Sequence, residues 1–135
     1  MKIRRARKED LEECLEMQKL DGGKYWNKDD FVKSIKDKLV IFLTAEEDKK
    51  ILGYIIGFHS PTKRSDVMIH ETRVNKKQRR KGIGTKLVNE FCKYAFKKGG
   101  KDIYAEIEPK LLKFYKNSCK FKITHKWIEV KKTKK

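Results

Sequence analysis

The stretch from Val74 to Val88 constrains the fold of this chain more than any other. An apolar, β-branched run ends at Val74, a basic turn with Gly82 and Gly84 follows, and an amphipathic helical pattern comes next. In such a strand–turn–helix unit, the free N–H groups of the first helical turn and the helix dipole attract an anion. The glycines let the backbone approach that anion closely. The sequence therefore predicts a phosphate-binding loop.

This loop differs from two well-known nucleotide-binding loops. A P-loop needs G-x-x-x-x-G-K-[ST], and no glycine lies five residues before Gly82 or Gly84. A dinucleotide-binding loop needs G-x-G-x-x-G, and Leu87 replaces its third glycine. Residues 79–84, Arg-Arg-Lys-Gly-Ile-Gly, instead match [QR]-x-x-G-x-[GA] and resemble the acyl-CoA pyrophosphate loop of the GNAT superfamily of N-acyltransferases. The resemblance implies acetyl-CoA as co-substrate, bound by Val74, Arg79, Arg80, Lys81, Gly82, Ile83, Gly84 and Thr85.

The other elements follow the order of the same family. Apolar and β-branched runs predict strands at residues 2–6, 39–45, 51–59, 67–74, 103–107 and 121–130. Helical spacing predicts a helix that ends at Asp21, a second capped by Asn27, a third that stops at Gly99, and a short one from Leu111 to Asn117. The expected fold is a mixed α/β sheet flanked by helices, GNAT-like, with residues 1–130 as one domain and 131–135 as a frayed basic tail.

Composition leaves two interpretations of the charge open. The formal net charge is +17, with 36 Lys and Arg against 19 Asp and Glu. A field of this sign attracts nucleic acid, ribosomes or CoA itself. Lysines scattered through every helix and turn are also typical of thermophile surfaces. Nucleic acid is therefore an alternative partner and not the favoured one.

The cysteines, histidines and apolar runs indicate where the protein works and whether it binds a metal. The three cysteines form no Cys-x-x-Cys pair, which is typical of a reducing compartment, and the three histidines lack ligand spacing, so no metal is expected. The first residues are charged, and the longest apolar runs are far below the roughly 20 residues that span a membrane. We therefore expect a cytoplasmic protein without membrane contact, either monomer or homodimer.

Tyr115 is the candidate general acid. Acyl transfer from a thioester to an amine needs a deprotonated amine, donors for the oxyanion and a proton for the thiolate. The Phe114-Tyr115 pair is similar to a segment of the GNAT family whose tyrosine protonates the leaving thiolate. The same resemblance implies that backbone groups of the strand ending at Val74 bind the pantetheine arm. Alternatively, the Tyr115 ring only packs beside the preceding leucines. Unlike the family pattern, one extra residue precedes Phe121, and Lys120 replaces a usual glycine.

The candidate base lies on the strand before the loop. Glu71 is the first choice and His70 the weaker one, and strand alternation predicts that they face opposite sides. A carboxylate paired with a lysine is the alternative role for Glu71. Glu106, on the neighbouring predicted strand, is a further carboxylate.

The acceptor is expected near residues 22–27. Tyr25 and Trp26 are candidates for the acceptor wall, or for a hydrophobic staple on the next helix. The positive field disfavours polyamines and aminoglycosides and favours a protein N-terminus or an amine with an acidic group. The sequence thus predicts an acetyl-CoA-dependent N-acetyltransferase that acts by direct attack in a ternary complex on a protein N-terminus or small-molecule amine. The alternatives are an RNA- or ribosome-binding protein and a non-catalytic CoA-sensing domain.

Overall fold

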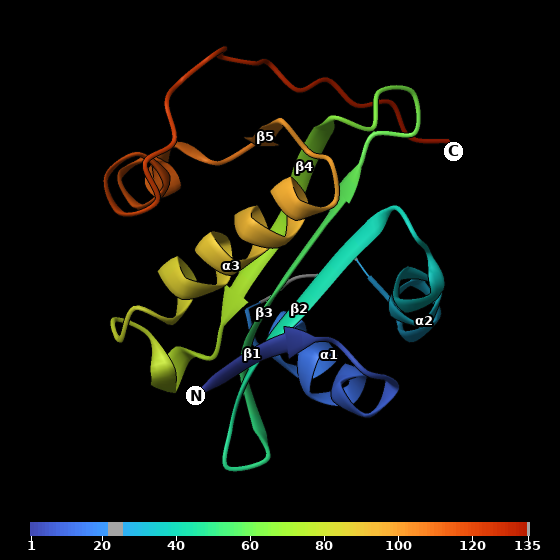
Figure 1. Cartoon of the computed structure of the whole chain (residues 1–135), viewed down its shortest axis with the longest axis vertical. Helices are drawn as coiled ribbons and strands as arrows, with labels where there is room; N and C mark the ends of the chain where they lie inside the picture. Colours follow the sequence, from blue (N-terminus) through green and yellow to red (C-terminus); the bar gives the residue numbers. More distant parts are fainter. Residues whose placement is uncertain (22–25, 135) are drawn as a thin grey trace.

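A computed structural model describes residues 1–21 and 26–134 of the chain (Figure 1). Its elements are β1 (Lys2–Arg5), α1 (Leu11–Leu20), α2 (Lys28–Lys36), β2 (Val40–Glu47), β3 (Lys50–His59), β4 (Asp66–Val74), α3 (Ile83–Lys97) and β5 (Asp102–Ala105). Short 3-10 turns lie at Lys8–Asp10, Lys76–Gln78 and Pro109–Leu111, and a π-helical turn spans Phe114–Ser118.

The five strands form one mixed sheet in the order β1-β2-β3-β4-β5. Strands β1 to β4 pair antiparallel with their neighbours, whereas β5 is parallel to β4. Helix α3 covers one face of the sheet, and α1 and α2 cover the other (Figure 1). Because both faces are covered, every residue from 51 to 57 of β3 is buried. The expected mixed α/β sheet flanked by helices is confirmed.

The entry into α2 matches the sequence prediction for Asn27. The Asn27 side chain accepts a hydrogen bond from the Asp30 N–H at 2.9 Å, and the Asp30 carboxylate accepts one from the Asn27 N–H at 3.0 Å. Trp26 stacks on Phe31, with ring centroids 5.5 Å apart. This is the staple geometry that was one of the two predicted roles of Trp26. Its predicted neighbour Tyr25, with residues 22–24, lies outside the described residues.

The predicted last strand, residues 121–130, is wrong. This segment follows β5 in the chain but pairs with no strand among the described residues, and Ile128 and Val130 are 90% and 88% exposed. A β-rich run becomes a strand only when an edge supplies partners for its backbone groups. Lysines at 122 and 126 would also need desolvation in a tight pairing. The preceding predicted strand is shorter than expected, because β5 ends at Ala105.

A buried ion pair ties β1 to the start of α1. Arg4 donates hydrogen bonds to both carboxylate oxygens of Asp10, at 2.7 and 2.9 Å, and also bonds Glu46. The Arg4 and Asp10 side chains are only 9% and 7% exposed. Burial alone would raise the pKa of Asp10, but the hydrogen bonds from Arg4 and the Arg7 N–H outweigh it, and the pKa lies below its ordinary value.

We expect this pair to make the free energy of unfolding depend on pH in the acid range. The Asp10 pKa is lower in the folded than in the unfolded chain, so its contribution is present above the unfolded value of about 4 and is lost as the pH falls through the folded value. Asp10→Asn should flatten this acid dependence and cost about 3 kcal/mol at neutral pH, since Arg4 loses a buried partner. Urea unfolding at a series of pH values measures both effects, and an unchanged acid slope in the variant would contradict the assignment.

Candidate active site

The strands β4 and β5 separate after a short stretch of pairing. They pair from Asp66 opposite Asp102 to Ile69 opposite Ala105. Beyond this point β5 ends, while β4 continues to Val74 and stays paired with β3 on its other side. In the described part of the chain, the end of β4 therefore lacks a strand partner on the β5 side. Its backbone N–H and C=O groups are available to an extended ligand.

A β-bulge sits in this open part of β4. Ile56 of β3 lies opposite Glu71, but the next residue, Gly57, lies opposite Ile69, so His70 is the additional residue. Ile69 belongs to the core under α3, whereas both His70 and Glu71 contact residues on the α1–α2 face. The prediction that His70 and Glu71 face opposite sides is wrong, because a bulge places two successive residues against one partner.

Two donors orient the Glu71 carboxylate. The Tyr54 hydroxyl and the Arg73 Nε both bind its Oε1, and Arg73 Nη1 binds Asp21 at 3.0 Å. Among the described residues, no hydrogen bond reaches Oε2. Burial and the neighbouring Glu71 raise the pKa of Tyr54, so its hydroxyl stays protonated and donates. The charged partner of Glu71 is thus an arginine and not the lysine considered from the sequence.

The other two predicted bases are less suitably placed. His70 accepts a hydrogen bond from Trp26 Nε1 at 2.8 Å, so the lone pair of its Nε2 is already occupied. Glu106 lies beyond the end of β5 and is exposed, so it does not point from a strand as expected.

Tyr115 lies on the α3 face of the sheet, opposite Glu71. It is 6% exposed, and its hydroxyl lies 3.3 Å from the Thr72 Oγ1 of β4. Its ring packs edge-on against Phe114 and Phe121, with centroids 5.0 and 5.4 Å away. Burial raises the pKa of Tyr115, so the hydroxyl remains a proton donor at neutral pH. The packing partners are these phenylalanines rather than the expected leucines.

The chain accommodates the extra residue before Phe121 with a π-helical turn. The Cys119 N–H donates to the Phe114 carbonyl at 3.1 Å, five residues back, where an α-helix would reach four. The predicted short helix is altered for this reason. Lys120 then has φ 64°, the left-handed conformation that glycine adopts most readily. A lysine therefore forms the turn for which the family pattern uses glycine.

The predicted phosphate loop leads into an open helix N-terminus. Gly82 has φ 77° and immediately precedes α3, and no described side chain caps this end of the helix. A Cβ built on Gly82 meets no described atom within 4 Å, while one on Gly84 would lie 3.3 Å from the Phe114 ring. The first N–H groups of α3, at Ile83, Gly84 and Thr85, therefore have no side-chain cap among the described residues.

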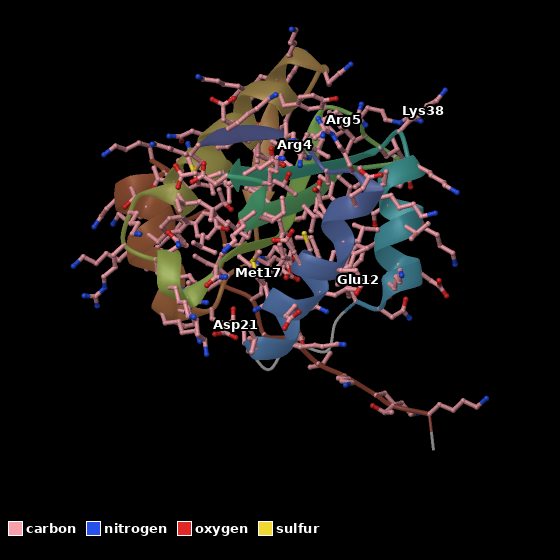
Figure 2. All side chains as sticks on the ribbon, turned by 90° about the horizontal axis from the view of Figure 1, so that it is seen from below. Arg4, Arg5, Glu12, Met17, Asp21 and Lys38 are labelled. Carbon is pink, nitrogen blue, oxygen red and sulfur yellow. The ribbon has the colours of Figure 1, made fainter. Side chains whose placement is uncertain are left out.

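The cationic side chains of the loop do not all point toward this helix. Arg79 donates to the Val74 carbonyl at 3.1 Å and to Asp21 at 2.8 Å. Asp21, at the end of α1 (Figure 2), also binds Arg73 and lies 3.7 Å from Lys76. The exposed Arg80 and Lys81 remain on the loop, and Lys81 donates to Gln78 at 3.0 Å. One acidic residue thus gathers three cations beside the loop.

Sequence reasoning missed four residues of this arrangement: Asp21, Tyr54, Thr72 and Arg73. The sequence could have indicated Arg73, because side chains two residues apart on a strand lie on the same face, and Arg73 is two residues from Glu71. Asp21 was interpreted only as part of a helix end.

Within residues 1–21 and 26–134, we find no metal site and no membrane-spanning helix. These residues contain no group of three or more His, Cys, Asp or Glu side chains that would hold a metal ion. None of their helices has the length and apolar character needed to cross a membrane.

Comparison with known proteins decides the family. A sequence profile for the acetyltransferase (GNAT) family matches residues 4–121. The chain belongs to this family. A comparison with curated protein sequences found no match.

Solved structures share the fold across nearly the whole chain. The aminoglycoside N-acetyltransferase AAC(6′)-Iy in complex with the bisubstrate analogue CoA-S-monomethyl-acetylneamine has a TM-score of 0.81 and 15% identity, with 98% of this chain and 97% of that chain covered. A transcriptional regulator from Bacillus halodurans C-125 gives 0.80 and 22%, covering 96% and 98%. Glucosamine-6-phosphate N-acetyltransferase from Arabidopsis thaliana gives 0.77 and 16%, covering 98% and 97%. At these identities the likeness concerns the fold.

Proposed function

We propose that this GNAT family member is an N-acetyltransferase that uses acetyl-CoA and transfers its acetyl group to an amine. The observation that carries the proposal is the continuity between the open edge of β4 and the uncapped N-terminus of α3 at Gly82. One segment of chain thus offers backbone partners for an extended amide arm and, next to them, an anion site. A pantetheine arm joined to a pyrophosphate has this combination of groups.

The residues around β4 suit direct attack within a ternary complex. The pyrophosphate is bound by the N–H groups of the first turn of α3 together with the side chains of Arg80 and Lys81. Arg79 joins them when it is released from Asp21. The backbone near Val74 aligns the pantetheine arm. Glu71 Oε2 accepts a proton from the amine, directly or through water, and the Tyr115 hydroxyl gives one to the thiolate as the C–N bond forms and the C–S bond breaks. Glu71 and Tyr115 flank β4 from opposite faces, so the two proton transfers do not compete for one position.

The acceptor amine belongs on the α1–α2 face, where Glu71 and Trp26 lie. Among the proteins with this fold, some carry names that specify aminoglycosides and one specifies glucosamine-6-phosphate. For this chain, the net charge of +17 opposes the approach of a polycationic aminoglycoside. A protein N-terminus or an amine that carries an acidic group fits the field better, and we propose these as the first acceptors to test.

Calorimetry at near-physiological salt tests the co-substrate. Acetyl-CoA and CoA should bind with micromolar affinity and ATP much more weakly, and transfer is then measured as free thiol released with a panel of amines and peptide N-termini. Equal affinity for CoA and ATP would mean that the loop is a basic turn without preference for CoA, and would favour the RNA-binding alternative. CoA binding without turnover on any acceptor would favour a CoA-sensing domain.

Glu71→Gln should lower kcat/KM for the acceptor about 100-fold, because the amide keeps the shape of the side chain but cannot take a proton. The affinity for CoA should not change, since Glu71 does not contact the loop. Steady-state kinetics with one acceptor and calorimetry with CoA measure the two effects separately. An unchanged kcat/KM would leave Glu71 as a structural partner of Arg73.

Asp21→Asn should tighten the binding of CoA about threefold to tenfold, because a carboxylate that competes with phosphate for Arg79 is removed. Glu47→Gln is the matched control: it changes the net charge equally, and among the described residues the Glu47 carboxylate forms an ion pair with the N-terminal amine and with no other cation. Calorimetric titration of both variants isolates the local effect. Weaker binding in Asp21→Asn would mean that Asp21 holds Arg79 where the phosphate needs it.

A further inference from the structure

A second groove lies between β1 and α3, away from the candidate active site. Its volume is about 340 Å³. Ile3 and Leu43 of the sheet form an apolar floor, Arg5 lies at one side, and Lys93, Tyr94 and Lys97 of α3 form the other wall. Figure 2 shows Arg5 on β1 at the end of the molecule that carries α3, with Asp21 at the opposite end.

The strand that borders this groove is the edge of the sheet. β1 pairs only with β2, from Lys2 opposite Glu46 to Arg5 opposite Leu43, so its outer edge has no strand partner within the described residues. An edge of this kind presents alternating N–H and C=O groups to an added strand. The groove therefore offers hydrogen bonds to a peptide main chain in addition to its side chains.

The charges of the groove select the side chains of such a peptide. Among the described residues, Arg5, Lys93 and Lys97 contribute three cations, against the carboxylate of Glu90, which lies 3.4 Å from Lys93. Arg4 also lines the groove, but its guanidinium is paired with Asp10 and Glu46. We propose that this groove docks an acidic, extended segment of a partner protein, added as a strand to β1 with its carboxylates toward Arg5, Lys93 and Lys97. The proposal does not depend on the proposed enzymatic activity.

Two other occupants fit less well. The aromatic side chain of the groove, Tyr94, has the Arg5 guanidinium 6.0 Å and the Lys98 ammonium 5.7 Å from its ring centroid. A nucleobase that stacked there would have to displace cations already held by the ring. The exposed tail of a second copy, residues 122–134, is rich in lysine and would be repelled by the same three cations.

The groove is also separate from the predicted acetyl-CoA site. Three strand spacings separate β1 from β4, or roughly 14 Å. A docked peptide and a bound CoA can therefore occupy the protein together, and a docked partner is held beside the enzyme without blocking it.

Fluorescence anisotropy at physiological salt tests the proposal with a short labelled peptide that alternates threonine and glutamate. We expect saturable binding that is unaffected by saturating CoA and weakened about tenfold by Lys93→Glu combined with Lys97→Glu. The matched control, Lys131→Glu combined with Lys132→Glu, changes the net charge equally in the exposed tail and should bind as the parent does. Equal loss in both double variants would mean attraction by net charge alone and would overturn the proposal.

Two further probes separate main-chain pairing from charge. The same peptide with every backbone nitrogen methylated keeps every carboxylate but has no N–H to donate to β1, and it should bind at least about tenfold more weakly. Equal binding of the methylated peptide would overturn strand addition. A labelled oligouridylate of equal charge should bind less tightly than the peptide. If it binds more tightly, and Lys93→Glu combined with Lys97→Glu abolishes that binding, the groove is a nucleic-acid site. If CoA displaces the peptide, the groove belongs to the co-substrate.

Discussion

Replacing Gly82 with glutamate should weaken CoA binding more than about 100-fold while the protein stays folded. Gly82 precedes the first turn of α3 and has open space around its Cβ position, so the new side chain fits without a clash. Its carboxylate would lie where we place the pyrophosphate and would also bind the same N–H groups itself. Like charges at one site cost several kcal/mol, which corresponds to this loss of affinity. Calorimetry with CoA measures it directly.

Gly99→Glu provides the matched control for this variant. Gly99 also has a positive φ, 96°, and open space around its Cβ position, but it lies at the opposite end of α3. Both variants therefore pay a similar cost of about 1–2 kcal/mol for a side chain in the left-handed region, and both add one negative charge. CoA affinity should fall only in Gly82→Glu. If Gly82→Glu binds CoA as tightly as the parent protein, or if both variants lose CoA affinity equally, the loop does not bind the co-substrate.

The predictable parts of this fold are those encoded in short stretches of sequence. The strand, glycine turn and helix around Gly82, the cap at Asn27 and the staple of Trp26 on Phe31 each depend on residues within a few positions of one another. Hydrophobic periodicity located the strands β2, β3 and β4 for the same reason. Local patterns of this kind report backbone conformation directly, and the mixed sheet follows from their order.

The parts that the sequence did not predict depend on contacts between distant segments. The bulge at His70 is set by the register of β4 against β3, and it moves two side chains to one face. The glycine at this place, Gly57, belongs to the partner strand β3, so the sequence around His70 gives no sign of the bulge. Asp21 gathers cations from beyond position 70, a relation that only the folded chain creates. The segment 121–130 has the pattern of a strand but no partner edge, which shows that alternation alone does not decide pairing.

Tyr115→Phe should lower kcat about 100-fold or more, with little change in KM for acetyl-CoA, since a positioned acid contributes about 10²–10⁴ to the rate. The phenylalanine keeps the ring contacts with Phe114 and Phe121, so the free energy of unfolding should change by about 1 kcal/mol at most. Burial raises the pKa of Tyr115 above its ordinary value, and the hydroxyl is protonated below that pKa. The parent enzyme should therefore show no loss of activity from Tyr115 until the pH exceeds about 10.

Thr72→Val separates proton donation from a structural hydrogen bond. The Tyr115 hydroxyl contacts Thr72 at 3.3 Å, so a purely structural role would act through this pair and both variants would lose similar activity. If the hydroxyl instead protonates the leaving thiolate, Thr72→Val keeps most of the activity, because valine preserves the volume of the side chain and leaves the acid in place. A panel of acetyl thioester donors made from increasingly acidic thiols sharpens the test. A more acidic thiol leaves as a more stable thiolate that needs a proton less, so the loss of activity in Tyr115→Phe should become smaller along the panel. A deficit that stays constant across these thiols would exclude Tyr115 as the acid.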